Sequence, residues 1–153
     1  MAAEAAIRNA VAANLPAIAA ISKAPYEDYI TRIGKRPEPM DADVSEPVQR
    51  GQVFVLELGA DIPGYIIIYA DDGSQLIENV SVAPEFQGQG FGARLLAFAE
   101  VEAARNSLPR LFLYTKAKMT ENLEYYPRLG YKEYKRALNQ GFERVLFEKR
   151  LGP

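Results

Sequence analysis

A glycine-rich segment in the middle of the chain has the composition of an anion-binding turn. Gly88, Gly90 and Gly92 follow a β-rich segment and precede a long helical pattern. Glycine lets backbone N–H groups approach a ligand closely. The first turn of a helix adds unpaired N–H donors and about half a unit of positive charge. The segment therefore predicts a site for a phosphate group.

Three interpretations of this turn compete. It can be a Gly-rich turn that binds nothing. It also fits the G-x-G-x-x-A fingerprint of dinucleotide-binding folds through Gly88, Gly90 and Ala93. That fingerprint expects an acidic residue at the end of the next strand, and the strand expected at 111–116 ends without one. A P-loop is excluded because no Gly-Lys-Ser/Thr follows. The third interpretation is a family resemblance that involves a second motif.

The residue types that are missing restrict the chemistry further. The chain contains no His and no Cys. This excludes Ser-His-Asp triads, Cys-His dyads, thiol nucleophiles and metal sites built from His or Cys, and no metal is expected. Any catalysis must therefore use carboxylates, phenols, Lys, Arg, hydroxyls or backbone groups.

Glu78 is the candidate general base. On the two-residue period of a strand it shares a face with Leu76, Val80 and Val82. A carboxylate among apolar neighbours has a raised pKa, which suits a base near neutral pH. A solvent-facing Glu is an equally weighted alternative, and a β-bulge would exchange Glu78 with Asn79.

Length and charge describe the whole chain. Its 153 residues suit one domain over 1–153, and 18 basic against 20 acidic residues give a net charge of −2, which is not the footprint of a nucleic-acid binder. The Ala-rich start lacks the uninterrupted apolar stretch of a signal peptide, and no run approaches 18 apolar residues. We expect a cytoplasmic protein that does not interact with membranes.

Periodicity and turn residues predict the elements that must position these groups. The element order βααβββαβαββ indicates an α/β (α+β) fold with one mixed, mostly antiparallel central sheet flanked by helices. A turn is expected over Gly59-Ala60-Asp61 and Pro63-Gly64, and Asn14 is the expected N-cap of the first helix, with Pro16 in its first turn. Strands are expected at 5–10, 53–58, 65–69, 76–82, 110–115, 132–137 and 142–149, and helices at 14–21, 25–33, 90–106 and 120–129, with a weak helix at 43–50.

Two motifs in the right order resemble those of the Gcn5-related N-acetyltransferase (GNAT) superfamily. Gln87-x-x-Gly90-x-Gly92 resembles its Q/R-x-x-G-x-G/A signature, and Tyr126-x-x-x-Gly130-Tyr131 resembles its Y-x-x-x-G-F/Y segment. The expected strand at 111–115 lies between them. The match in element order covers about residues 53–151, and the match in motifs covers 77–96 and 120–131.

The resemblance implies acetyl-CoA as co-substrate. Its diphosphate would bind to backbone N–H groups, and its pantetheine arm would pair with the strand main chain at Val80 and Val82, which would splay from the strand at 111–115. Tyr126 would be the phenol that protonates the departing thiolate, in preference to Tyr125, and Asn122 would contact the pantetheine. Arg94 either touches a phosphate or is solvated. The implied diphosphate-binding residues are Gln87, Gly88, Gln89, Gly90, Phe91 and Gly92.

The implied activity is transfer of an acetyl group to a primary amine by direct attack in a ternary complex. The acceptor would be a small-molecule or peptide amine, with Tyr26 and Tyr29 as candidate binding residues; both also fit a half-buried helix surface. An acyltransferase for longer acyl chains and a non-catalytic acyl-CoA-binding sensor are the alternatives. The run 145–147 fits either a homodimer contact or the core.

Overall fold

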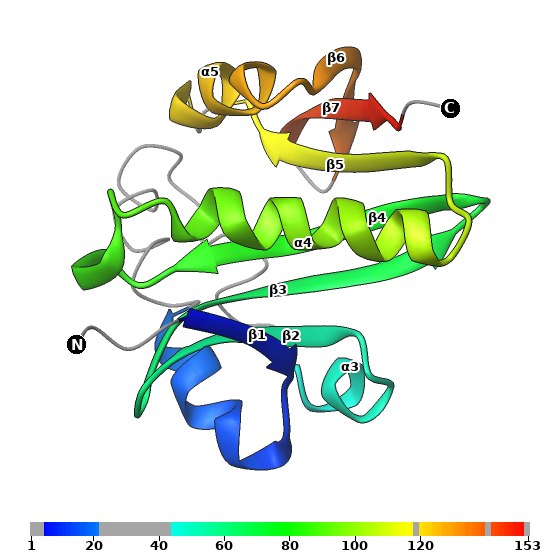
Figure 1. The fold of residues 1–153 in the computed structure, drawn as a ribbon. Coiled ribbons are helices and arrows are strands. Elements are labelled where there is room, and N and C mark those ends of the chain that lie inside the picture. The colour runs from blue at the N-terminus through cyan, green and yellow to red at the C-terminus, as the bar shows by residue number, and fades with distance from the viewer. Residues whose placement is uncertain (1–4, 22–43, 118–119, 140–141, 152–153) are drawn as a thin grey trace. The chain divides into compact units, whose positions relative to one another are not determined.

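The computed structural model describes residues 5–21, 44–117, 120–139 and 142–151. Seven strands form one sheet in the order β1-β2-β3-β4-β5-β7-β6 (Figure 1). The β4–β5 pair is parallel, and the β1–β2, β2–β3, β5–β7 and β6–β7 pairs are antiparallel. The predicted mixed α/β fold is confirmed. The strands are β1 (Ala5–Asn9), β2 (Val53–Leu58), β3 (Asp61–Asp71), β4 (Ser74–Val82), β5 (Arg110–Lys116), β6 (Lys132–Asn139) and β7 (Phe142–Arg150).

The helices agree with the predictions in number and place beyond residue 44. They are α3 (Ser45–Gln49), α4 (Phe91–Arg105) and α5 (Thr120–Arg128), with 3-10 turns η1 (Ala12–Asn14) and η2 (Pro84–Phe86). The predicted helix at 25–33, with Tyr26 and Tyr29, lies outside the described residues. Of the helices that are described, none is long and apolar enough to span a membrane.

Contacts divide the chain into two compact units. Unit 1 comprises Met1–Ile68 and Asn79–Phe98, and unit 2 comprises Tyr69–Glu78 and Ala99–Pro153. Strand β4 therefore belongs to unit 2 as far as Glu78 and to unit 1 from Asn79 onward. The glycine turn lies in unit 1, and α5 lies in unit 2.

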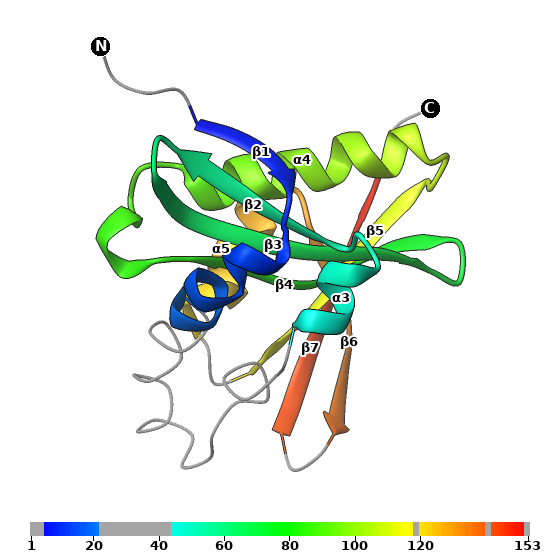
Figure 2. The same cartoon turned by 90° about the horizontal axis from the view of Figure 1, so that it is seen from below.

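Unit 1 is built on strands rich in β-branched and aromatic residues, which favour the extended conformation. Phe54 of β2 meets Phe98 of α4, with ring centroids 4.8 Å apart. The neighbouring positions point to the opposite face, where the helix at 15–21 packs (Figure 2). Burying each of these large side chains contributes about 1.5–3 kcal/mol. The core on this second face contains Ile18, Ile21, Val53, Val55, Tyr65 and Ile67, each at most 4% exposed.

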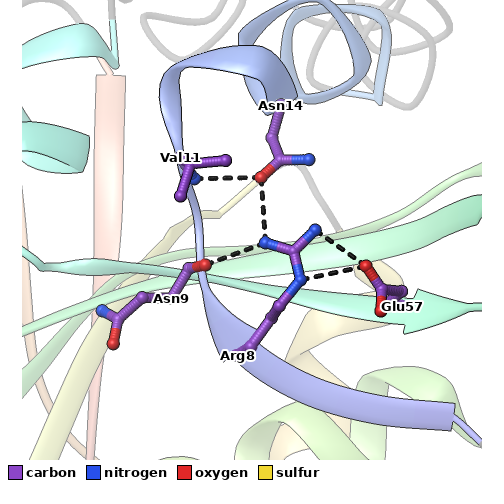
Figure 3. A network of polar contacts seen from close by, with 5 residues as sticks. All are labelled: Arg8, Asn9, Val11, Asn14 and Glu57. Carbon is purple, nitrogen blue, oxygen red and sulfur yellow. Dashed lines mark hydrogen bonds and ion pairs between the residues drawn. The ribbon is translucent and has the colours of Figure 1, made fainter.

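A polar network joins β1, β2 and η1 (Figure 3). Arg8 donates from Nε and Nη2 to Glu57 Oε2 (2.9 and 2.8 Å) and from Nη1 to Asn14 Oδ1 (3.1 Å). The same Oδ1 accepts the N–H of Val11 at 2.9 Å. The prediction of Asn14 as N-cap was wrong. Its carboxamide oxygen accepts hydrogen bonds from these two donors, which precede it in the chain, and Asn14 is the last residue of η1. The helix then occupies 15–21, with Pro16 in its first turn as predicted.

The turn between β2 and β3 is shorter than predicted. Only Gly59-Ala60 form it, with Gly59 at φ 61°, and Pro63-Gly64 lie inside β3. A Cβ at position 64 would lie 2.6 Å from Ser81 O and 3.2 Å from Leu95 Cδ1. Gly64 is therefore a close-packing residue that lets β4 and α4 approach β3, which composition alone cannot distinguish from a turn glycine.

In unit 2, helices cover one face of the strands. Asn122 of α5 donates to Thr115 Oγ1 at 2.9 Å, and Gln75 of β4 donates to the carbonyl of Ala99 in α4 at 3.0 Å. Leu111, Leu113, Thr115, Val145 and Phe147 are at most 6% exposed. The sequence left two interpretations of residues 145–147, a homodimer contact or the core. Val145 and Phe147 are core residues.

Candidate active site

The glycine turn connects β4 to α4 within unit 1. Gly88 and Gly90 both have φ of 82°, and nothing lies within 4 Å of a Cβ built on either residue. Glycine is required here by the left-handed backbone conformation, since there is room for a side chain. The turn therefore keeps its main chain free of side-chain cover at these two positions.

The first α-helical hydrogen bond of α4 runs from Arg94 N to Gly90 O at 3.1 Å. The N–H groups of Phe91, Gly92 and Ala93 precede that bond, as the first donors of any helix do. The N–H of Gln87 donates to Pro84 O at 3.3 Å within η2. The run of donors that suits an anion thus follows Gln87.

Neighbouring side chains fix the turn in place. Gln87 Nε2 donates to Val82 O at 3.1 Å, which ties the turn to the end of β4. The rings of Phe86 and Phe91 pack edge-on with centroids 6.2 Å apart, and Phe91 is 9% exposed. A ligand would therefore meet Phe91 through its main chain. Arg94 donates to Ala5 O of β1 at 3.0 Å, so its guanidinium helps to hold β1.

The end of β4 in unit 1 carries a buried polar chain. Asn79 Nδ2 donates to the Tyr65 hydroxyl at 2.7 Å, and Ser81 Oγ donates to Asn79 Oδ1 at 3.1 Å. Ser81 is 6% exposed and Tyr65 is fully buried. Val80 and Val82 are half-buried. The side chain of Asn79 thus points to Tyr65 and Ser81, and this network was not predicted.

Glu78 belongs to unit 2 and its side chain is exposed. The expectation that apolar neighbours surround it was wrong, because strand periodicity assigns a face without showing what covers that face. Its negative charge acts on Tyr69, whose pKa is raised by burial first and then by Glu78, Asp71 and Tyr114. The Glu78 side chain therefore lies at the surface of unit 2.

Tyr126 lies in α5 of unit 2 and is 8% exposed. Its ring lies 5.4 Å from Tyr125, 5.8 Å from Tyr131 and 5.8 Å from Phe147, measured between centroids. The N–H groups of Leu129 and Tyr131 donate to its carbonyl at 3.0 and 3.1 Å. Ring packing and backbone bonds together give Tyr126 a fixed orientation.

Sequence reasoning missed a lysine that joins three elements of unit 2. Lys149 Nζ of β7 donates to Leu129 O, at the end of α5, at 2.8 Å and to Glu100 Oε2 of α4 at 3.1 Å. A Cβ at position 130 would lie 3.2 Å from Lys149 Cε. Gly130, at φ 93°, thus gives the lysine room as well as ending α5. No sequence signal links position 149 to position 130.

The family comparison covers both motifs. Residues 49–133 match the family model described as "Acetyltransferase (GNAT) domain". The chain belongs to the GNAT acetyltransferases. The predicted family is confirmed, and with it an acetyl-CoA-dependent acetyltransferase.

Curated relatives and solved structures agree with this assignment. An uncharacterized N-acetyltransferase, YesJ of Bacillus subtilis, is 27% identical over 123 residues, which are 71% of this chain and 67% of that protein. The mycothiol acetyltransferase of Jonesia denitrificans is 35% identical over 82 residues, 52% of this chain and 26% of that protein. The PaiA N-acetyltransferase of Thermoplasma acidophilum, solved with coenzyme A, superposes with a TM-score of 0.76 at 16% identity, covering 97% of this chain and 99% of that one.

Proposed function

We propose that this protein transfers the acetyl group of acetyl-CoA to a primary amine by direct attack in a ternary complex. The observation that carries the proposal is the glycine turn at the start of α4, inside the segment that matches the acetyltransferase family model. Its positive-φ glycines and first-turn N–H groups suit the diphosphate of the co-substrate. The pantetheine arm pairs with the main chain of Val80 and Val82, in the manner of an added strand.

Three groups would carry the chemistry. Glu78 accepts a proton from the attacking amine, directly or through water. The new N–C bond forms as the C–S bond of the thioester breaks, and a backbone N–H near Val80 stabilises the oxyanion. Tyr126 donates its phenolic proton to the departing thiolate. Exchange with solvent then restores the protonated phenol and the free carboxylate, so the products are the acetamide and coenzyme A.

The side-chain environments support these roles. Glu78 is exposed, as a base that meets an external amine must be. Tyr126 is nearly buried among aromatic rings, which restricts its hydroxyl to few positions. One amide hydrogen of Asn122 makes a hydrogen bond to Thr115. The carbonyl oxygen of its side chain is the atom that would accept a hydrogen bond from a pantetheine N–H.

The test is release of coenzyme A, measured with DTNB across a panel of amines. Tyr126→Phe is expected to lower kcat by about 100-fold, the usual contribution of a general acid, while KM for acetyl-CoA changes little. Tyr125→Phe is the matched control, because Tyr125 is the neighbouring half-buried phenol, and it is expected to keep most of kcat.

Two outcomes would contradict the proposal. Calorimetric binding of acetyl-CoA without turnover of any amine would indicate a non-catalytic acyl-CoA-binding module. An acetylated protein, trapped with labelled acetyl-CoA in the absence of amine, would replace direct attack by a covalent intermediate.

A further inference from the structure

The strands of unit 2 have a second face, opposite α4 and α5. Along β5 the residues at 111, 113 and 115 are at most 6% exposed, whereas Phe112 and Tyr114 are half-buried. The register of the antiparallel β5–β7 pair places Lys116 opposite Arg144 and Tyr114 opposite Leu146. Because side chains alternate along a strand, Tyr114, Arg144 and Leu146 share the second face.

A fixed positive charge lies on this face. The guanidinium carbon of Arg144 lies 4.2 Å from the centre of the Tyr114 ring, and Arg144 is half-buried. This is within the range of a cation–π contact, which orients the planar guanidinium against the ring. Arg144 thus presents its charge at a defined place beside Tyr114.

The proposed base lies on the strand next to Tyr114. Parallel pairing aligns Leu76 of β4 with Phe112 of β5, and Glu78 and Tyr114 each lie two residues further along their strands. Glu78, Asp71 and Tyr114 all act electrostatically on Tyr69, which agrees with this placement. These neighbouring strands therefore carry carboxylates near Tyr69 and a guanidinium beside Tyr114.

We propose that the amine acceptor also carries a carboxylate, with its amino group at Glu78, its carboxylate at Arg144, and the rings of Tyr69 and Tyr114 between them. The inference rests on the proposed function, because Glu78 as base fixes where the amine end must lie. A zwitterion complements two opposite charges separated by aromatic rings. A diamine would bring its second ammonium group to the guanidinium, and an alkylamine would leave the guanidinium without a charged partner from the ligand.

The experiment compares acceptors of equal chain length. β-Alanine, 4-aminobutyrate and 5-aminovalerate are each compared with the alkylamine and the diamine of the same carbon number, using release of coenzyme A. Wild type is expected to favour amino acids over matched alkylamines by about tenfold or more in kcat/KM, the scale of one charge-assisted hydrogen bond. Arg144→Gln is expected to remove that preference mainly through KM, and Arg144→Lys to keep part of it.

Arg110→Gln is the matched control. Arg110 lies on β5, stacks at 5.3 Å on both Phe112 and Tyr134, and pairs with Glu148 at 3.0 Å. It is a half-buried arginine with similar aromatic contacts, but it is not placed beside Tyr114. We expect Arg110→Gln to keep the wild-type preference for amino acids.

The outcomes separate this inference from the function on which it rests. If no amine is acetylated, the proposed function fails and the inference fails with it. If alkylamines or diamines are acetylated as well as the amino acids, the function stands and the inference is overturned. Preservation of the preference in Arg144→Gln would also overturn it. The wild-type comparison alone decides the substrate class, even if an Arg144 variant does not fold.

Discussion

Single positions in unit 1 show how closely the elements that hold the glycine turn are packed. Gly64 lies where a Cβ would meet Ser81 O at 2.6 Å and Leu95 Cδ1 at 3.2 Å. The first of these is a backbone atom of β4, which cannot move without shifting the strand. Position 64 is therefore a steric requirement for packing β3 against β4 and α4.

Gly64→Ala is expected to destabilise the protein by about 1–3 kcal/mol, the usual cost of overpacking. Urea denaturation at neutral pH measures the change. Gly73→Asn is the control, because Gly73 has φ 75° and nothing lies within 4 Å of its Cβ. Asn tolerates this conformation, so the control is expected to change stability by less than about 0.5 kcal/mol. Equal losses in both variants would show that the contact with Ser81 is not the cause.

At the scale of elements, the sequence predicted what periodicity and turn residues can report. Strand β2 agrees with its predicted bounds at 53–58, and α4 agrees within one residue at each end. Pro63-Gly64 was misassigned because a glycine required by a close contact looks the same in sequence as one required by a turn. The exposure of Glu78 and the role of Asn14 depend on non-local neighbours, which one sequence does not reveal.

The anchoring of α5 is another non-local feature. Lys149 reaches from β7 to the last turn of α5 and to Glu100 of α4, with both side chains of this pair less than a third exposed. Its charge also lies at the helix C-terminus, where a cation is favourable. Tyr126 is in the same last turn, and its carbonyl accepts two N–H groups there. The lysine therefore helps to fix the segment that carries the proposed acid.

Lys149→Met keeps the aliphatic chain beside Gly130 and removes both hydrogen bonds. We expect a loss of about 1.5–3 kcal/mol, because these bonds involve a charged group in a partly buried place. Hydrogen exchange at the amides of Leu129 and Tyr131 should quicken, and kcat should fall more than the affinity for acetyl-CoA. Arg128→Met is the control, since its pair with Glu124 spans 3.8 Å and is mostly exposed. Unchanged exchange at both amides in Lys149→Met would contradict the anchoring role.

At the scale of the whole molecule, folding wholly or partly buries several tyrosine side chains of unit 2. Tyr131 is 2% exposed, and no described residue offers its hydroxyl a hydrogen bond. Burial, and then the nearby Glu100 and Tyr125, raise its pKa above the ordinary value of 10.0. Burial also raises the pKa of Tyr125. Ionising these groups is therefore more costly in the folded chain than in the unfolded chain.

The consequence is a loss of stability at alkaline pH. Below pH 10 both states hold the phenolic protons, and the stabilisation is complete. As pH rises above 10 the unfolded chain releases the Tyr131 proton first, so the free energy of unfolding falls by up to about 1.4 kcal/mol per pH unit for that group.

Tyr131→Phe should remain at least as stable as wild type at pH 7, because it loses a buried hydroxyl, and should lose stability less steeply between pH 10 and 11. Urea denaturation across this range measures both slopes. Tyr134→Phe, which alters a phenol that is 43% exposed, is the control and should follow the wild-type curve. Parallel curves for wild type and Tyr131→Phe would show that the buried phenol does not limit alkaline stability.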